Sequence, residues 1–383
     1  MRLLIAADTV ATGGAGRINQ LLAEGLRARS MEVILAGPEY LGHSDPLAPA
    51  GSGGGRALLD DRLPAAQAFA ALQPDLVLFA CGGPHSLVAA REEAAAQGIP
   101  FISLVHQVDG RWASPGLQPR ISALFAASRE VVAVSEHNLR LLRSCFGLED
   151  QHGRVIVNAL PEMFFAPVDP ALRGSIREEL GLSPEALLVL TAARVDLAKG
   201  PQHLLEVVRY LPSGGEDAAT RLRFVWAGEG PPRNQLTALA RMLGQGERLR
   251  FIGPRDDVLS LLAAADLAVL PSEAEGMPLA VLEAMALGVP MIAADAGGTA
   301  EALADTGVVV GDLCSDREGT RERLLAALLR LARDPAERQR LGDLARKRAT
   351  LLFRQERMVE DYLGVLQQSL PASVTPTSER SQG

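Results

Sequence analysis

The sequence predicts an α/β protein with two doubly wound domains. Short apolar runs of strand length alternate with longer stretches of helical period, which is typical of parallel sheets covered by helices on both faces. The alternation starts again after residues 158–170, a segment with three prolines and no helix or strand period, where a linker is expected. The chain has 383 residues, 48% of them hydrophobic, which is enough apolar material for two cores.

The first domain is expected to span residues 1–165. Its strands are predicted at residues 2–7, 32–36, 75–80, 100–105, 131–134 and 155–157. Its helices are predicted at residues 15–29, 65–72, 86–96, 117–127 and 136–145. Residues 37–64 do not fit this alternation, because they are rich in Gly, Pro and Ser and too long for an ordinary connection. We interpret them either as a functional lid or as a disordered insertion.

The second domain is expected to span residues 166–353. Its strands are predicted at residues 187–193, 222–227, 250–252, 267–270, 291–294 and 308–310, and its first helices at residues 202–210, 234–243, 258–264 and 279–286. Residues 318–370 are almost wholly helical in pattern, with an interruption at Asp334 and Pro335, where a proline can begin a new helix. Ligands of such folds bind at the carboxyl ends of the strands, so two facing domains would enclose a cleft.

The chain's last segments are assigned separately. A final helix at residues 354–370 is long enough to pack back across the linker onto the first domain. Residues 371–383 form a polar tail without periodicity, which we expect to be disordered.

The charge balance limits the kind of partner. The chain has 38 basic and 46 acidic residues and a formal net charge of −8, which argues against a protein that wraps a nucleic acid or an anionic membrane. Only Lys199 and Lys347 are lysines, and every other basic residue is an arginine. A compact ammonium group in a chain that otherwise uses guanidinium groups indicates a specific task, and Lys199 is the candidate.

The cysteines and the apolar runs favour a cytoplasmic protein. Cys81, Cys145 and Cys314 are odd in number and far apart in sequence, so we expect reduced thiols. No apolar run approaches the roughly 20 residues that a membrane-spanning helix needs. The first residues run directly into a strand pattern, so no signal peptide is expected.

Three arginines on the first predicted helix bear on membrane contact. Arg17, Arg27 and Arg29 form a local group of cations that would allow a weak peripheral contact. We do not predict such binding, because residues 1–165 contain more acidic than basic side chains.

Two glutamates after a predicted strand form the most informative candidate site. Glu275 lies in the loop that follows residues 267–270, and Glu283 lies in the next helix. A carboxylate at the head of a helix is a natural bidentate acceptor for two vicinal hydroxyls, and each such bond contributes about 1.5–3 kcal/mol. Glu275 would address another part of the same ligand. The alternative is that these acidic groups only complement the helix dipole.

A second candidate site combines two cations. Arg194 follows the strand predicted at residues 187–193, and Lys199 lies at the start of the next helix. A lysine at a helix N-terminus opposes the helix dipole unless an anion lies between them. A phosphate would satisfy both cations and the helix end together. The alternative is a surface lysine that tolerates a small unfavourable interaction.

A glycine-rich turn opens the first predicted helix and contains Gly13, Gly14 and Arg17. Glycine lets a ligand approach the backbone closely, and the free N–H groups suit an anion or a polar acceptor. The turn is a weak signal by itself. It is also no dinucleotide fingerprint, because the sequence contains no G-x-G-x-x-G.

His106 follows the strand predicted at residues 100–105 and precedes a loop that contains Trp112. Histidine is suited to contact a polarised sugar near neutral pH, and Trp112 could stack on a sugar or a lipid. The alternative for His106 is a hydrogen-bonded histidine of the core. Trp226 lies within an apolar strand and is expected in the core.

Several other site types lack support. The sequence contains no D-x-D, no His/Cys cluster with zinc spacing, no P-loop and no G-x-S-x-G. A metal-bridged nucleotide site, a P-loop NTPase and a serine hydrolase therefore lose support, and no metal or other cofactor is expected.

The order of these residues resembles the retaining family 4 glycosyltransferases of GT-B fold, which consist of two Rossmann-like domains facing a cleft and a C-terminal helix that crosses back to the first domain. The likeness extends to about residue 365 and is more specific in the second half of the chain. It rests on Gly13, Gly14, His106, Arg194, Lys199, Gly228, Glu229, Gly230 and the E-x7-E pair Glu275 and Glu283.

The resemblance implies a nucleoside diphosphate sugar as the donor. Glu283 would bind the ribose hydroxyls, and Arg194 and Lys199 the diphosphate. Glu275 and the loop after it would bind the donor sugar. The implied donor-binding residues are Gly14, Arg194, Lys199, Glu275, Gly276, Met277, Leu279 and Glu283.

The resemblance also implies where the acceptor and the chemistry lie. The acceptor-binding residues would be Gly13, Gly14, Arg17, His106 and Trp112, and the catalytic residues would be His106, Arg194, Lys199 and Glu275. Catalysis without a metal agrees with the two cations and the helix end, which would stabilise the charge that develops on the departing diphosphate.

Two departures from the family pattern concern local geometry. Pro278 lacks the N–H group that another residue would offer to a sugar hydroxyl, so sugar recognition would depend on Met277 and Leu279. Asn158 is followed by Ala159 where the family more often has glycine, which affects the linker and no charge of the site.

The sequence thus predicts retaining, metal-independent transfer of a hexose to a hydroxyl on a small molecule, a glycan or a lipid carrier. One alternative is a GT-B sugar phosphorylase or epimerase. Another is a non-catalytic protein that only binds nucleotide sugars. The second alternative would predict loss of Glu275, Glu283 or the Arg194 and Lys199 pair, and all four residues are present.

Overall fold

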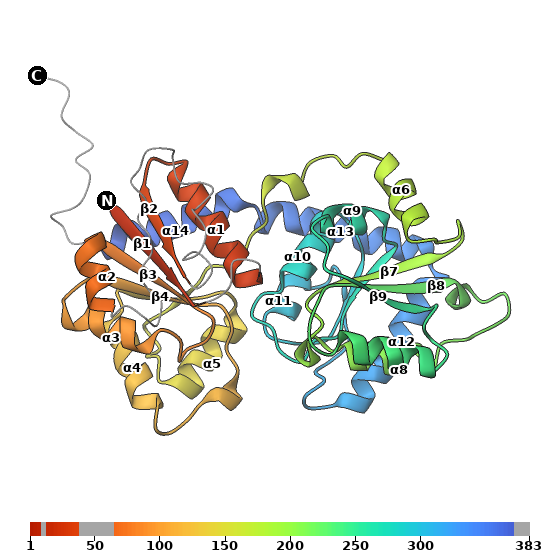
Figure 1. Ribbon diagram of the computed structural model, residues 1–383, viewed down its shortest axis with the longest axis horizontal. Helices are drawn as coiled ribbons and strands as arrows, with labels where there is room; N and C mark the ends of the chain where they lie inside the picture. The colour runs from red at the N-terminus through yellow and green to blue at the C-terminus, as the bar shows by residue number, and fades with distance from the viewer. Residues whose placement is uncertain (9–12, 38–64, 371–383) are drawn as a thin grey trace, which may run out of the picture. The chain divides into compact units, whose positions relative to one another are not determined.

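The computed structural model describes residues 1–8, 13–37 and 65–370, which fold as two compact units. The first unit contains the chain up to Ala159 and the residues from Gln355 onward, and the second unit is Leu160–Arg354 (Figure 1). The predicted lid or insertion after Gly37 and the predicted disordered tail lie outside the described residues.

The boundary between the units lies inside the predicted linker, at Ala159 and not at residue 165. Its position has a local cause. The backbone N–H of Leu160 donates to Phe353 O at 2.8 Å, and Leu160 forms an isolated parallel bridge with Arg354. The linker is therefore tied to the end of the second unit's last helix from Leu160 onward.

The first unit contains a parallel sheet in the order β2-β1-β3-β4-β5-β6. All strands predicted for it are confirmed, with small shifts at their ends. β1 and β3 are buried almost throughout, because helices cover both faces. The strands are β1 (Arg2–Ala7), β2 (Glu32–Ala36), β3 (Leu76–Cys81), β4 (Phe101–Val105), β5 (Glu130–Ala133) and β6 (Arg154–Val155).

The helices of the first unit lie on the two faces of this sheet (Figure 1). One face carries α1 and α14, which contact each other, and the other carries α2 to α5. The helices are α1 (Gly14–Arg27), α2 (Ala65–Leu72), α3 (Val88–Ala96), α4 (Gln118–Ala127), α5 (Glu136–Phe146) and α14 (Gln355–Ser369).

The return of the last helix to the first unit is confirmed. Gly25 of α1 makes the contact with α14 possible, because a Cβ there would lie 2.3 Å from Val359 Cγ2. Gln355 Nε2 donates to Leu21 O at 2.9 Å, and Arg357 Nη2 donates to Val157 O at 2.8 Å.

The second unit repeats the architecture with a parallel sheet in the order β12-β11-β10-β7-β8-β9. Its predicted strands are also confirmed. β7 pairs with β8, which follows it in the chain, and also with β10, although β8 and β9 come between β7 and β10 in sequence. The strands are β7 (Leu187–Ala192), β8 (Leu222–Ala227), β9 (Leu249–Gly253), β10 (Leu267–Leu270), β11 (Met291–Ala293) and β12 (Val308–Val309).

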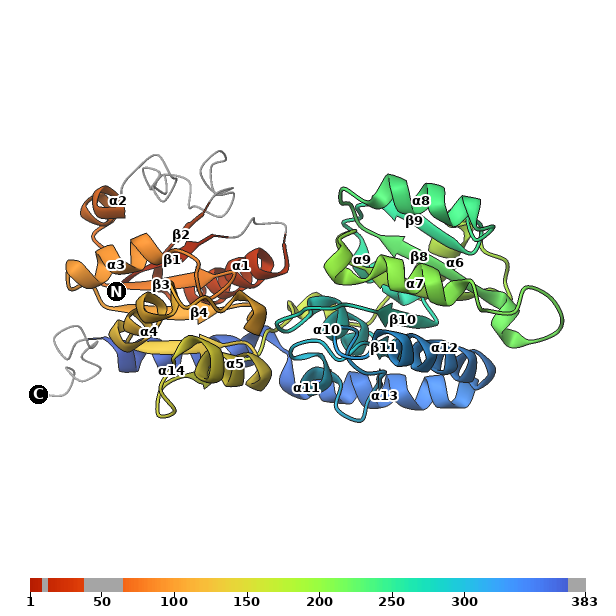
Figure 2. The same cartoon turned by 90° about the horizontal axis from the view of Figure 1, so that it is seen from below.

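Helices cover both faces of the second sheet as well. Figure 2 shows α7 and α8 on one side of the strands, and α12 contacts α7. The helices are α6 (Ala171–Glu179), α7 (Pro201–Val208), α8 (Arg233–Met242), α9 (Val258–Ala264), α10 (Leu279–Ala286), α11 (Thr299–Leu303), α12 (Arg317–Arg333) and α13 (Pro335–Leu352).

Two helices were not predicted, for different reasons. In α6 only Ile176 is buried, so the sequence shows no apolar stripe. The five residues of α11 are too few to show a helical period. The predicted interruption at Asp334 is confirmed, because its carboxylate accepts from Glu337 N at 2.9 Å and Pro335 begins α13.

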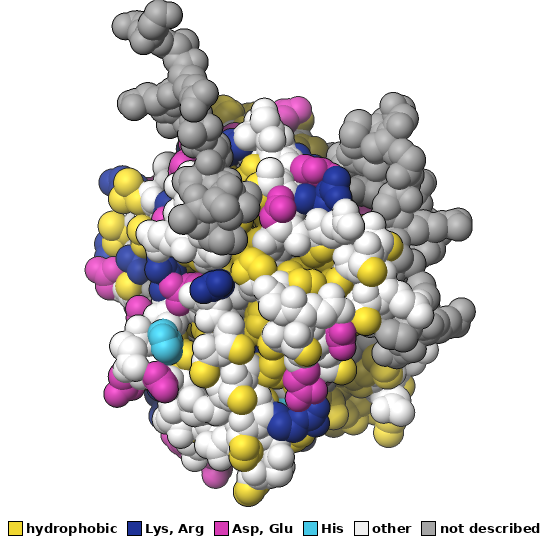
Figure 3. Space-filling model, turned by 90° about the vertical axis from the view of Figure 1, so that its left-hand side faces the viewer, with side chains coloured by type: hydrophobic (Ala, Val, Ile, Leu, Met, Phe, Trp, Pro, Cys, Tyr) yellow, Lys and Arg dark blue, Asp and Glu magenta, His cyan; other side chains and the backbone are white. Residues whose placement is uncertain are grey.

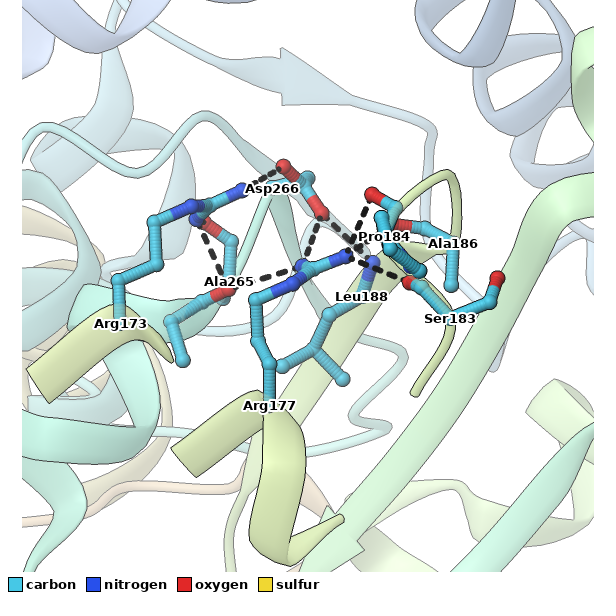
Figure 4. Close-up of polar contacts among 9 residues, drawn as sticks. Arg173, Arg177, Ser183, Pro184, Ala186, Leu188, Ala265 and Asp266 are labelled. Atoms are coloured by element: carbon cyan, nitrogen blue, oxygen red, sulfur yellow. Dashed lines mark hydrogen bonds and ion pairs between the residues drawn. The ribbon is translucent and has the colours of Figure 1, made fainter. Parts of the chain in front are cut away.

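Asp266 fixes the start of β10 at the sheet edge opposite its carboxyl end (Figure 4). Its Oδ2 atom accepts from Leu188 N at 2.8 Å and lies 3.1 Å from Arg177 Nη1, while Oδ1 accepts from Arg173 Nη2 at 2.6 Å. These bonds connect α6 with the starts of β7 and β10, the two strands that are followed by the candidate site residues.

Apolar side chains fill both units, and Trp226 is fully buried as predicted. Within the described ranges, every helix is too short or too polar to cross a membrane.

Candidate active site

The charged candidate residues of the second unit lie at the carboxyl edge of its sheet. Arg194 follows β7, and Lys199 ends a short 3-10 helix at Leu197–Lys199 before α7. Glu275 follows β10 and Glu283 lies in α10. Because β7 and β10 are hydrogen-bonded neighbours, the segments that follow them meet at the same edge.

Lys199 and Glu275 form an ion pair there. Lys199 Nζ lies 2.7 Å from Glu275 Oε1, which also accepts from Ser272 Oγ at 2.8 Å. The Glu275 side chain is 7% exposed and that of Lys199 is 21% exposed. The sequence predicted that the two residues bind separate parts of a ligand, and the structure brings them into direct contact.

Arg194 is not part of this pair. Its side chain is 70% exposed and lies 3.3 Å from Asp196 Oδ2. An exposed ion pair of this kind contributes little to stability, so Arg194 can change partners readily. The structure thus separates one half-buried cation, Lys199, from one exposed cation.

Glycine backbones set the position of Lys199. Gly200 caps α7 with a φ of +77°, and a Cβ on it would lie 1.7 Å from Pro271 O. Only glycine allows the segment after β7 to touch the segment after β10 in this way. The helix start predicted at Lys199 is therefore corrected: Lys199 precedes the cap, and Pro201 is the first residue of α7.

Other glycines allow two more close backbone contacts at this edge. A Cβ on Gly228 would lie 1.9 Å from Ala193 O, and a Cβ on Gly297 would lie 1.8 Å from Glu275 O. Gly298 N also donates to Gly276 O at 2.7 Å. Gly297 and Gly298 were not predicted as site residues, although a glycine pair in the loop after a predicted strand is a usable signal.

Glu283 is buried in α10, with 2% of its side chain exposed. It lies in the second turn of the helix, and the first turn contains no acidic residue. The prediction of a carboxylate at the head of the helix is therefore wrong, and so is the alternative that it complements the dipole there.

The loop between the two glutamates is also buried. Met277 is 5% exposed and Leu279 is 8% exposed, and Pro278 caps the helix without a side-chain bond. The backbone around Gly276 is held by Gly298 N. This arrangement gives the loop a fixed shape before any ligand binds.

His203 is a buried histidine that supports the segment between β10 and Glu275. It was not among the residues predicted from the sequence. His203 Nε2 lies 2.7 Å from Glu273 Oε1, and Nδ1 accepts from Arg321 Nε at 3.1 Å. Burial lowers the pKa of His203 below its ordinary value. Glu273 N in turn donates to Ala198 O at 2.7 Å, which ties this segment to the one that carries Lys199.

The candidate residues of the first unit lie at three places. Gly13 caps α1, which begins at Gly14 and contains Arg17 in its first turn, while residues 9–12 lie outside the described part. Trp112 is 37% exposed and its ring lies edge-on to His85, with centroids 5.6 Å apart.

His106 lies directly after β4 and is 7% exposed. Its Nε2 atom lies 3.0 Å from Asn19 Oδ1. Burial lowers the pKa of His106 to about 4, so the ring is neutral at pH 7. A substrate hydroxyl near neutral pH would therefore meet a neutral ring.

The arginines considered for membrane contact have partners within the first unit. Arg27 Nε donates to Val33 O at 3.2 Å, and Arg29 pairs with Glu360 of α14. On the face shown in Figure 3, acidic and basic side chains of the described residues are interspersed. These contacts reduce the support for a basic patch on α1.

Comparisons with known families match both halves of the chain. The model described as glycosyl transferases group 1 matches residues 173–348. The model described as glycosyltransferase family 4 matches residues 12–161. Together the two models cover most of the chain, and each matches one unit.

Curated relatives include transferases of two substrate types. D-inositol 3-phosphate glycosyltransferase 1 of Catenulispora acidiphila is 32% identical over 238 residues, which are 57% of this chain and 56% of the relative. The match thus spans little more than half the length of that relative. A GDP-mannose-dependent monoacylated alpha-(1-6)-phosphatidylinositol monomannoside mannosyltransferase of Corynebacterium glutamicum is 26% identical over 76% of each chain.

Solved structures share the fold. Sucrose-phosphate synthase from Thermosynechococcus elongatus has a TM-score of 0.74 at 19% identity, covering 96% of this chain and 99% of its own. Anabaena HepE in complex with UDP has a TM-score of 0.76 at 18% identity with the same coverage. The two sheets, the returning α14 and the two family matches agree: this chain belongs to the family 4 glycosyltransferases of GT-B fold.

Proposed function

We propose that this chain transfers a hexose from a nucleoside diphosphate sugar to an acceptor hydroxyl, with retention of anomeric configuration and without a metal ion. The observation that carries the proposal is Glu283, a carboxylate buried in α10 at the sheet edge where the Lys199–Glu275 pair lies. One relative is named for GDP-mannose and one solved neighbour was determined with UDP, which supports a donor of this class.

In this proposal Glu283 accepts hydrogen bonds from the ribose hydroxyls of the donor. A carboxylate accepts charge-assisted hydrogen bonds from hydroxyls, and two vicinal hydroxyls supply two donors. Glu275 and the backbone of Gly276, Met277 and Leu279 hold the donor sugar.

Lys199 and Arg194 neutralise the diphosphate. Lysine has three N–H donors, so Lys199 can keep its bond to Glu275 and still donate to a phosphate oxygen. Arg194 is exposed and can leave Asp196 for the ligand. With Lys199 held in place by Glu275 and Arg194 turned to the ligand, the two cations stabilise the charge on the leaving diphosphate without a metal.

The reaction exchanges one bond for another at the anomeric carbon. The bond to the β-phosphate oxygen breaks, and a bond to the acceptor oxygen forms on the same face of the sugar. The proton of the acceptor hydroxyl passes to the departing phosphate oxygen. His106, neutral at pH 7, contacts a substrate hydroxyl as a hydrogen-bond partner and does not supply a charge.

The first experiment identifies the donor. Thermal unfolding is measured with a panel of UDP- and GDP-sugars, because a ligand at 100 times its Kd stabilises the folded state by about 2.7 kcal/mol. A shift with one base and one sugar is expected. A panel without any shift would contradict the proposal.

The second experiment tests the reaction. Release of nucleoside diphosphate is measured with and without acceptors that include inositol phosphate and a lipid-linked polyol, since relatives are named for such acceptors. Release that requires the acceptor, survives EDTA and gives a product with the donor's anomeric configuration supports the proposal. Release without any acceptor would favour an epimerase, and release that requires inorganic phosphate would favour a phosphorylase.

A further inference from the structure

His106 is held by hydrogen bonds on three sides. Its backbone N–H donates to Cys81 O at 2.9 Å, and its backbone O accepts from Asn138 Nδ2 at 3.3 Å. Its ring atom Nε2 lies 3.0 Å from Asn19 Oδ1. The fourth polar atom, Nδ1, is buried and has no partner among the described residues.

The partner on Nε2 decides where the ring proton is. An amide oxygen can only accept a hydrogen bond, so Nε2 must carry the proton that Asn19 Oδ1 receives. The ring is neutral, and a neutral imidazole has one protonated nitrogen. Nδ1 is therefore a bare acceptor.

We propose that Asn19 is a positioning residue for glycosyl transfer: its side-chain oxygen fixes His106 in the Nε2–H form, so that Nδ1 accepts a hydrogen bond from a hydroxyl of the substrate. This inference rests on the proposed function and adds Asn19 to it. Asn19 lies on α1, is fully buried, and was not among the predicted site residues.

A buried acceptor without a donor is unfavourable, which is why Nδ1 points to a ligand. The described part of the chain supplies no donor, and sugar hydroxyls are donors of the right kind. Asn19 Nδ2 and Asn138 Oδ1 are also buried and have no partner within the described ranges, so the same cluster offers one further donor group and one further acceptor. An all-neutral cluster of this composition suits hydroxyls better than an anion.

The tautomer is tested first, in the ligand-free full-length protein. The six histidines are labelled with ¹⁵N, and the His106 signals are assigned by their absence in His106→Gln. We expect Nδ1 to resonate as an unprotonated nitrogen and Nε2 as a protonated one. In Asn19→Leu, which has similar volume and no acceptor, the two signals are expected to move toward a mixture of tautomers, and Asn19→Asp should retain the Nε2–H form.

A protonated Nδ1 in the wild type would overturn the proposal, because the Asn19 amide would then be reversed. Unchanged ring signals in Asn19→Leu would overturn it as well. Gln20→Leu is the matched control, since it makes a similar exchange at the next position of α1, where the side chain is only half-buried.

Kinetics then test the role. Asn19→Leu is expected to lower kcat about tenfold with a small change in the donor KM, because one oriented hydrogen bond is lost. The same substitution in the His106→Ala background should have no further effect, since Asn19 acts through His106. Additive losses would overturn the proposal and indicate a general structural role.

The two proposals fail in different ways. If the wild type turns over no nucleotide sugar, the proposed function fails, while the ligand-free spectra still decide the tautomer. If turnover is present and Asn19→Leu is as active as Gln20→Leu with the same thermal midpoint as wild type, only the role of Asn19 fails.

Discussion

The two units present different chemistry at the ends of their strands. The second unit carries an ion pair, a buried carboxylate and an exposed arginine, and glycines allow close backbone contacts at the same edge of its sheet. The first unit carries a neutral cluster of Asn19, His106 and Asn138, in which three buried atoms have no partner among the residues that the structure describes. The comparison teaches that the two units differ in the charge they present. Under the proposed function, the charged groups of the second unit would meet the diphosphate and the neutral groups of the first unit would meet hydroxyls.

The largest expected effect is at Glu283. Replacing Glu283 by Ala removes two proposed charge-assisted bonds to the ribose, so kcat/KM should fall by about 10⁴-fold. Turnover of the donor found by the panel is the measurement. Glu247→Ala, at an exposed position of the same unit, is the control. Activity near the wild-type level in Glu283→Ala would show that the buried carboxylate of the second unit does not bind the donor.

Lys199 comes next. Lys199→Met should lower kcat by about 10³-fold, as loss of a group that stabilises developing charge does. It also leaves Glu275 buried without its cation, so the thermal midpoint should fall. The double variant Lys199→Met with Glu275→Gln should regain stability and remain inactive. Lys347→Met changes the other lysine, which is exposed on α13, and should change neither property.

Gly200 tests whether backbone contact positions this site. Gly200→Ala places a Cβ against Pro271 O at a positive φ, so the free energy of unfolding should fall by about 3 kcal/mol. Gly181→Ala is matched in φ, at +62°, but has nothing within 4 Å of the added atom. It should cost only about 1 kcal/mol. Equal losses in urea unfolding would show that the contact with Pro271 is unimportant.

His106 gives the smallest effect, and it concerns pH. The native pKa of about 4 lies below the value of 6.5 for an unperturbed histidine, so between these values the unfolded chain binds more protons. The contribution of neutral His106 to the free energy of unfolding is fully present above pH 6.5. It decreases as the pH is lowered, by about 2 kcal/mol between pH 7 and pH 5.

Urea unfolding of the wild type and of His106→Gln is measured at pH 7 and at pH 5. The wild type is expected to lose about 2 kcal/mol more than His106→Gln when the pH is lowered. His152→Gln, at an exposed histidine, controls for the loss of a histidine as such. An identical pH dependence in the wild type and His106→Gln would show that His106 is not a buried neutral residue.

Local patterns were sufficient for most of the fold. Strands and helices could be predicted from the apolar run Leu3 to Ala7 and the alternation that follows it. The reason is that the spacing of apolar residues within each element reflects which of its residues are buried. The same approach failed for α6, whose one buried residue gives no pattern. It identified Glu283 as a ligand candidate but misplaced it within its helix.

The site's contacts were beyond such patterns. Lys199 and Glu275 are 76 residues apart, and they meet because β7 and β10 are neighbours in a sheet whose order differs from the chain order. The role of Gly200 depends on the carbonyl of Pro271, which no local window contains. The bond between Asn19 and His106 likewise joins residues 87 positions apart.

By itself the sequence determined the two doubly wound domains and the identity of the charged candidates, because these depend on periodicity, spacing and residue type. The return of the last helix was expected from the family resemblance. Only the tertiary structure decided which groups are paired, which are buried and whether His106 carries a charge. The physical reason is that ion pairs, tautomers and pKa values depend on the atoms that surround a side chain and exclude water from it, and distant segments supply those atoms.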